Sequence, residues 1–172
     1  MSLAPWMVES ANKYLRAAEI LYRTDYNLLH VASINAAIGL EILLKSFVAR
    51  VTENEGKVNQ NYSPDSEIIK AGHALLKAED NAKARPDAHD LLTLFYAIPE
   101  PVRLAAGISR HEANVEFCRH LFTASRYEYE STAPKSFCDT SIAVLREMVP
   151  SVVAYYKQSG CTDCWIVSYP NV

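Results

Sequence analysis

The sequence predicts an all-α fold, an up-and-down helical bundle of five or more helices. Hydrophobic residues recur three and four positions apart in several long segments, which is the period of one helix face. Strand and helix patterns do not alternate along the chain, which argues against a parallel sheet. We therefore expect one helical domain over residues 1–160, followed by an irregular tail over residues 161–172.

Two long helices are predicted in the first third of the chain. The first covers about Trp6 to Arg23, and Pro5 stands where a first helical turn tolerates proline. The second covers about Leu28 to Val51 and is apolar on nearly every side. We therefore expect the second helix to be the central and most buried element.

The second helix also has to be judged as a membrane segment. Val31 to Val48 is nearly long enough to cross a bilayer, but Glu41 and Lys45 lie within it and would be costly in lipid. They stand four residues apart with the acid first, the favourable order for an ion pair on one helix face. A central helix of a soluble bundle therefore fits better, and we expect no membrane partner.

Polar connections separate the remaining helices. Gly56 and Pro64 belong to a polar stretch that predicts a loop from Glu53 to Asp65, and Gly72 weakens the helix that follows it. The further helices are expected at Ser66–Asn81, Ala88–Ala97, Ser109–Ser125 and Lys135–Lys157, with an additional helical turn at Val102–Ile108. Asp87 can cap the helix at Ala88–Ala97, and Pro150 should kink the helix at Lys135–Lys157.

Composition and charge limit the classes of function. The chain has 172 residues, of which 49% are hydrophobic and 22% charged, a balance that allows a sizeable buried core. Its net charge of −3 gives no general attraction for nucleic acid, so such binding would need a local basic patch. The N-terminal residues show no signal-peptide pattern, and we expect a cytoplasmic protein whose four cysteines are reduced.

Four segments, in this order, resemble helices of the HEPN family. They read YLRAAEILY in the first helix, SINAAIGLEILLKSFV in the second, HDLLTLF from His89 to Phe95, and FCRHLFTASRYEYE from Phe117 to Glu130. The resemblance covers most of residues 10–157. It implies an up-and-down bundle, commonly a homodimer. The family includes RNA-cleaving toxins and defence ribonucleases, and also non-catalytic partners of nucleotidyltransferases.

The chain departs from the ribonucleases of that family at one point. Those enzymes carry an Arg and a His separated by four to six residues near the start of a late helix. Arg126 is the comparable arginine, but Ser131, Thr132 and Ala133 occupy the positions where the histidine would stand. The departure argues against ribonuclease activity.

The densest polar and aromatic group in the sequence contains Arg126, Tyr127, Tyr129 and Glu130. Arg126 could hold a phosphate through both branches of its guanidinium group, and the tyrosines could stack on bases. Alternatively, Arg126 pairs with a carboxylate and the tyrosines pack a helix junction.

Four further candidates lie earlier in the chain. Glu41 and Lys45 could act near a dimer seam, or could form only a structural ion pair. His89 and Asp90 could be an acid–base pair, or Asp90 could stabilise a helix start beside a solvent-facing His89. In both cases we favour the structural interpretation. Local basic charge also occurs at Arg110, His111, Arg119 and His120, which we interpret as a solvated helix face.

Cys161 and Cys164 have the spacing of a metal or redox pair. A zinc site would need two more ligands, and the sequence contains no second such pair. We therefore expect two free thiols in the tail, and neither a metal nor a cofactor.

These observations lead to one main hypothesis and two alternatives. We expect a HEPN-like dimeric helical module without its own catalysis, acting with nucleic acid, a nucleotide or a nucleotidyltransferase-type partner in a toxin–antitoxin or defence context. The first alternative is an RNA-cleaving enzyme with a non-standard site around Arg126. The second is a purely structural protein-interaction module.

Overall fold

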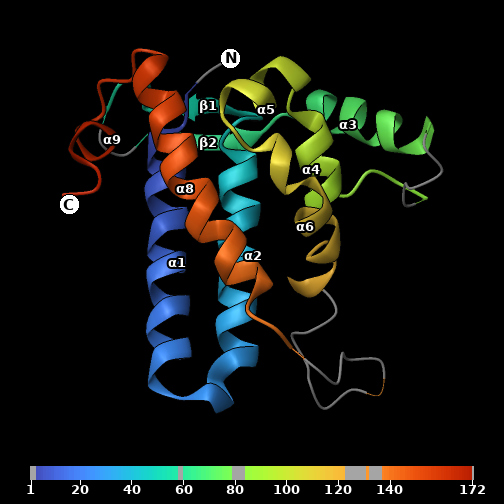
Figure 1. Cartoon of the computed structure of the whole chain (residues 1–172). Coiled ribbons are helices and arrows are strands. Elements are labelled where there is room, and N and C mark those ends of the chain that lie inside the picture. Colours follow the sequence, from blue (N-terminus) through green and yellow to red (C-terminus); the bar gives the residue numbers. More distant parts are fainter. Residues whose placement is uncertain (1–2, 58–59, 79–83, 123–130, 132–136, 172) are drawn as a thin grey trace.

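The computed structural model describes residues 3–57, 60–78, 84–122, 131 and 137–171. Within these residues the chain is mostly helical and contains one small antiparallel hairpin (Figure 1). The helices of this part are α1 Pro5–Thr24, α2 Leu29–Lys45, α3 Ser66–Ala78, α4 Leu91–Ala97, α5 Glu100–Ala105, α6 Glu112–Phe117, α8 Thr140–Gln158 and α9 Cys164–Ser168. The strands are β1 Ala49–Glu53 and β2 Asn61–Pro64, and 3₁₀ turns cover Tyr26–Leu28 and Ser109–His111.

Helix α2 lies at the centre of the helical core. Helix α1 runs beside it and α8 packs against both, as Figure 1 shows. The three helices pack tightly at Gly39, where an added Cβ would collide with Leu145 of α8 and lie 3.3 Å from the Ala11 carbonyl oxygen of α1. The expectation that the second helix is the central one is therefore confirmed.

Among the described residues, one segment, Tyr26–Lys45, is long and apolar enough to cross a membrane. In this fold 56% of its most apolar window is buried inside the protein. Its neighbours there are α1, α4 and α8. Burial in a protein core is sufficient to account for its apolar composition.

The predicted end of the second helix and the loop after it are wrong, because a small antiparallel hairpin accompanies the helices here. Helix α2 ends at Lys45, and β1 then pairs with β2. The Ser46 carbonyl oxygen, which would otherwise continue the helix, accepts a hydrogen bond of 3.1 Å from the Tyr156 hydroxyl of α8. The same hydroxyl accepts a 3.3 Å hydrogen bond from the Ala4 backbone N–H, so one buried tyrosine joins three segments. The β-branched residues that follow in β1 favour a strand.

Helix α4 begins at Leu91, three residues later than predicted, because Asp90 caps it instead of Asp87. The side chain of Asp87 accepts a 2.8 Å hydrogen bond from the His89 backbone N–H in the turn before the helix. The helix predicted from Ser109 is also interrupted, since a turn follows the end of α6.

The C-terminal part differs from the prediction in two places. Helix α8 begins at Thr140, later than the predicted Lys135, and it continues on both sides of Pro150. The tail is not irregular throughout, because it contains the short helix α9. Asp163 caps α9 by accepting hydrogen bonds from the backbone N–H groups of Trp165 and Ile166.

Helix α3 approaches the backbone of α4 at Gly72. An added Cβ there would lie 2.5 Å from the Ala97 backbone nitrogen and 2.6 Å from the Thr93 carbonyl oxygen. Backbone atoms cannot move aside as the end of a flexible side chain can. Close packing therefore requires glycine at a position where helix propensity disfavours it.

We predict that Gly72→Ala lowers the free energy of unfolding by about 1–3 kcal/mol, the usual cost of overpacking. Helix propensity alone predicts the opposite sign, a gain of about 1 kcal/mol. Urea unfolding followed by circular dichroism measures the difference. The control is Ala74→Gly on the exposed side of the same helix, which should cost about 1 kcal/mol. A Gly72→Ala protein more stable than the wild type would contradict the close contact.

Candidate functional site

The eight candidate residues from the sequence fall into two groups. Arg126, Tyr127, Tyr129 and Glu130 lie outside the described residues. Glu41, Lys45, His89 and Asp90 lie within them, at the place where α2 packs against the start of α4. Three of these four side chains form one cluster, and the fourth supports it.

Glu41 is the centre of this cluster. Its Oε1 atom accepts a 2.6 Å hydrogen bond from Lys45 Nζ on the same helix and lies 3.0 Å from His89 Nδ1. The side chains of Glu41 and Lys45 are only 11% and 13% exposed, whereas that of His89 is 56% exposed. The ion pair expected from the sequence is therefore present, and it holds one edge of an accessible imidazole.

The position of His89 is fixed by contacts on several sides. The Asp87 carboxylate accepts its backbone N–H, and the ring of Phe122 lies 6.3 Å from the imidazole between ring centres. When Nδ1 of a neutral histidine donates to a carboxylate, Nε2 is left as a hydrogen-bond acceptor. A positioned imidazole of this kind can bind a polar ligand or transfer a proton.

Asp90 pairs with Arg119 rather than with His89. Its two carboxylate oxygens accept hydrogen bonds of 2.6 Å from Arg119 Nε and 2.7 Å from Arg119 Nη2. It also accepts a 2.7 Å hydrogen bond from Thr93 Oγ1 and one of 3.3 Å from the Leu92 backbone N–H. The helix-start interpretation of Asp90 is therefore the one that the geometry supports, and Glu41 takes the place beside His89 that the acid–base hypothesis gave to Asp90.

Arg119 and His111 lie in the interior, so the interpretation of both as part of a solvated helix face is wrong. Arg119 is 9% exposed, and its charge is neutralised by the buried Asp90. His111 is 4% exposed, and its Nε2 accepts a 3.0 Å hydrogen bond from Arg110 Nε. Burial and the adjacent Arg110 charge lower the pKa of His111.

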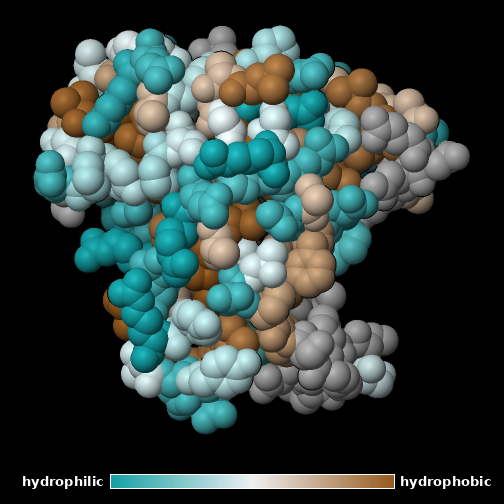
Figure 2. Space-filling model, in the orientation of Figure 1, coloured by the Kyte–Doolittle hydropathy of each residue, from teal (hydrophilic) through white to brown (hydrophobic). Residues whose placement is uncertain are grey.

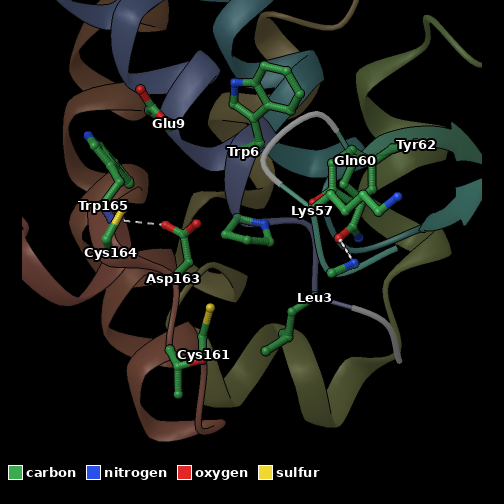
Figure 3. Close-up of a pocket in the computed structure, with 13 residues that line it drawn as sticks. Leu3, Trp6, Glu9, Lys57, Gln60, Tyr62, Cys161, Asp163, Cys164 and Trp165 are labelled. Atoms are coloured by element: carbon green, nitrogen blue, oxygen red, sulfur yellow. Dashed lines mark hydrogen bonds between the residues drawn. The ribbon is translucent and has the colours of Figure 1, made fainter. Parts of the chain in front are cut away.

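A pocket of about 570 Å³ lies among the start of α1, the hairpin and the start of α9 (Figure 3). None of the eight candidate residues named above lines it. Trp6 and Trp165 do, and so do Cys161 and Cys164. Sequence analysis missed this site because its walls come from segments that are far apart in the chain.

The two cysteines of the pocket are free thiols, and in Figure 3 their side chains do not point toward one another. Burial raises the pKa of the Cys161 thiol, which disfavours the thiolate that metal binding needs. No group of three or more His, Cys, Asp or Glu side chains suited to a metal occurs in the described part of the chain. The structure therefore gives no support to the metal interpretation of this pair.

No family model matches the chain, and searches of curated proteins and of solved structures find no match either. The resemblance to the HEPN family rests on the four sequence segments. Any functional interpretation depends on those segments and on the geometry of the two sites.

We predict that Asp90→Asn lowers the free energy of unfolding by about 3–5 kcal/mol, because Arg119 loses the carboxylate that neutralises its buried charge. Asparagine also caps helices well, so this substitution removes the charge of Asp90 but keeps a cap for α4. Chemical denaturation measures the effect. The control is Glu67→Gln, which removes an exposed ion pair with Lys70 on α3 and should change stability little. Equal effects of the two substitutions would refute a special role for the buried pair.

Proposed function

We propose that the chain is a HEPN-like helical module that binds RNA or a nucleotide and works as a non-catalytic accessory of a nucleotidyltransferase-type or defence system. The supporting observation is the meeting of Glu41, Lys45 and His89 in one cluster. Glu41 and Lys45 belong to the second of the four HEPN-like segments, and His89 belongs to the third. Glu41 and His89 meet although 48 positions separate them in the sequence. The proposal includes the up-and-down bundle and a kink at Pro150.

The chemistry of the cluster suits an anionic ligand with aromatic bases. An accessible imidazole can stack on a base and form hydrogen bonds with it. Lys45 neutralises the Glu41 carboxylate, which would otherwise repel a phosphate. Arg126 follows Phe122 by four residues in the sequence, and the ring of Phe122 lies beside His89. The proposal assigns a phosphate contact to Arg126 and base stacking to Tyr127 and Tyr129, all outside the described residues.

We predict that His89→Ala lowers the affinity for a single-stranded oligoribonucleotide or a nucleotide about tenfold, the loss expected for one stacked base. Fluorescence polarisation with labelled ligands measures it. Arg126→Ala should lower the affinity further without changing the melting temperature. His30→Ala is the matched control. His30 lies at the start of α2, three turns before Glu41, and its ring packs on Phe137, so its removal should leave ligand affinity unchanged. Wild-type affinity in both His89→Ala and Arg126→Ala would overturn the proposal.

The contact between Glu41 and His89 favours an RNA-cleaving enzyme as the second candidate. A carboxylate on Nδ1 orients the imidazole, so Nε2 can take a proton from an attacking hydroxyl group. This adds an acid–base group to the non-standard site around Arg126.

Incubation with structured RNA separates the candidates. Cleavage that falls by about 10²–10⁴-fold in His89→Ala, and also falls in Glu41→Gln, indicates the enzyme. Binding without cleavage indicates the accessory module. If the protein neither binds nor cleaves RNA, the purely structural interaction module is the remaining candidate.

We also propose that the protein is a cytoplasmic homodimer. Two large hydrophobic side chains of this part of the chain remain exposed, Leu104 of α5 at 62% and Phe117 of α6 at 69%. Figure 2 shows hydrophobic side chains over α5 and along α6, among polar ones. Aromatic residues are enriched in the centres of protein interfaces, and burial of this surface would stabilise a dimer.

We predict that multi-angle light scattering at micromolar concentration gives twice the chain mass of 19.2 kDa. Phe117→Ser should shift the protein toward the monomer, because it removes apolar area from the interface. Ile20→Ser is the matched control, since Ile20 is 63% exposed but lies on α1. A monomeric wild type would disprove the dimer, and a dimer that Phe117→Ser leaves intact would move the interface elsewhere.

A further inference from the structure

Both tryptophans of the chain line the pocket beside the hairpin. Trp6 lies in the first turn of α1 and Trp165 in α9, and the sequence contains no other tryptophan. The volume of about 570 Å³ falls within the range of about 300–1,000 Å³ that is usual for small-molecule sites. A tilted contact with Tyr169, 5.2 Å between ring centres, holds the Trp165 ring in place.

Charges of opposite sign lie on opposite sides of this pocket. Figure 3 shows Glu9, Asp163 and Trp165 along one side, and Lys57 on the other side beside Gln60 and Tyr62. Trp6 lies between the two sides. The pocket therefore has an acidic half lined by Trp165 and a basic, hydrogen-bonding half, with Trp6 between them.

The acidic half keeps a carboxylate oxygen for a ligand. Asp163 uses Oδ1 to cap α9, with hydrogen bonds of 3.0 Å from the Trp165 N–H and 3.1 Å from the Ile166 N–H. Its Oδ2 atom takes no part in the cap. Glu9 forms an ion pair with Lys13, whose side chain is 61% exposed, and solvent screens such pairs strongly.

The basic half can hold an anionic group. Lys57 forms no ion pair within the described residues. Burial and the nearby Asp163 raise the pKa of the Tyr62 phenol, so its hydroxyl stays protonated and can donate a hydrogen bond.

We propose that this pocket binds a small zwitterionic ligand of the amino-acid class. The ammonium end lies against the two indoles and the two carboxylates, since indole faces attract cations. The carboxylate end contacts Lys57. A nucleotide or other polyanion fits poorly, because Glu9 and Asp163 would repel it, and a purely apolar ligand would satisfy neither the Asp163 carboxylate nor the Lys57 ammonium group.

Tryptophan fluorescence reports on this pocket alone, because both tryptophans line it. Four probes separate the charges: glycine betaine and γ-butyrobetaine carry both, choline carries only the cation, and 3,3-dimethylbutanoate is the anionic carbon analogue of glycine betaine. Isothermal titration calorimetry with the same probes gives a second readout. We expect at least one zwitterion to bind about tenfold or more tightly than either singly charged probe, since two contacts act together.

Substitutions in the two halves locate the two contacts. Lys57→Met should reduce the affinity for the zwitterion to that for choline. Asp163→Asn keeps a helix cap and should lower the affinities for the zwitterion and for choline by the same factor. Lys70→Met on α3 is the control and should change nothing, and circular dichroism checks each fold. The proposal is overturned if neither method detects saturable binding at millimolar concentration, or if the anionic analogue binds as well as the zwitterions.

Discussion

The guanidinium group of Arg119 is buried, and a buried charge is tolerated only where an opposite charge and hydrogen bonds compensate it. Asp90 supplies both, through two short hydrogen bonds to the same guanidinium group. Because Asp90 is also the cap of α4, this one carboxylate fixes the start of α4 relative to the turn after α6. His89 is the preceding residue, so its place beside Glu41 follows from the same pair. The candidate site on α2 and α4 is therefore built on a buried ion pair.

Local patterns were enough to predict the long helices and one ion pair. The first helix was predicted to within a residue at each end, since its apolar period and Pro5 are signals within the segment itself. The pair of Glu41 and Lys45 was predictable for the same reason, because the two residues stand four apart on one helix. The start of α2 and the central position of this helix followed from its all-round apolar character.

Contacts between distant residues decided what the sequence patterns did not reveal. Just after the end of α2, the Ser46 carbonyl oxygen accepts a hydrogen bond from a hydroxyl group 110 residues away, which the apolar pattern of the helix does not indicate. Arg119 has a basic neighbour in the sequence and was taken for a surface residue, but its partner stands 29 residues earlier. The pocket is a further case, because Trp6 and Trp165 stand near opposite ends of the chain and meet only after folding.

Tyr156 makes the stability of the fold depend on pH in the alkaline range. Its hydroxyl donates to the Ser46 carbonyl and accepts from the Ala4 N–H, and burial raises its pKa to about 12 from an ordinary value of 10.0. In the unfolded chain the phenol ionises near its ordinary pKa, whereas the folded protein keeps the proton. Above a pH equal to the ordinary pKa of 10.0, the unfolded state binds fewer protons than the native state. The free energy of unfolding therefore falls as the pH rises toward 12. The ionised oxygen could no longer donate to Ser46, and strong base would therefore loosen the hairpin, the N-terminus and α8 together.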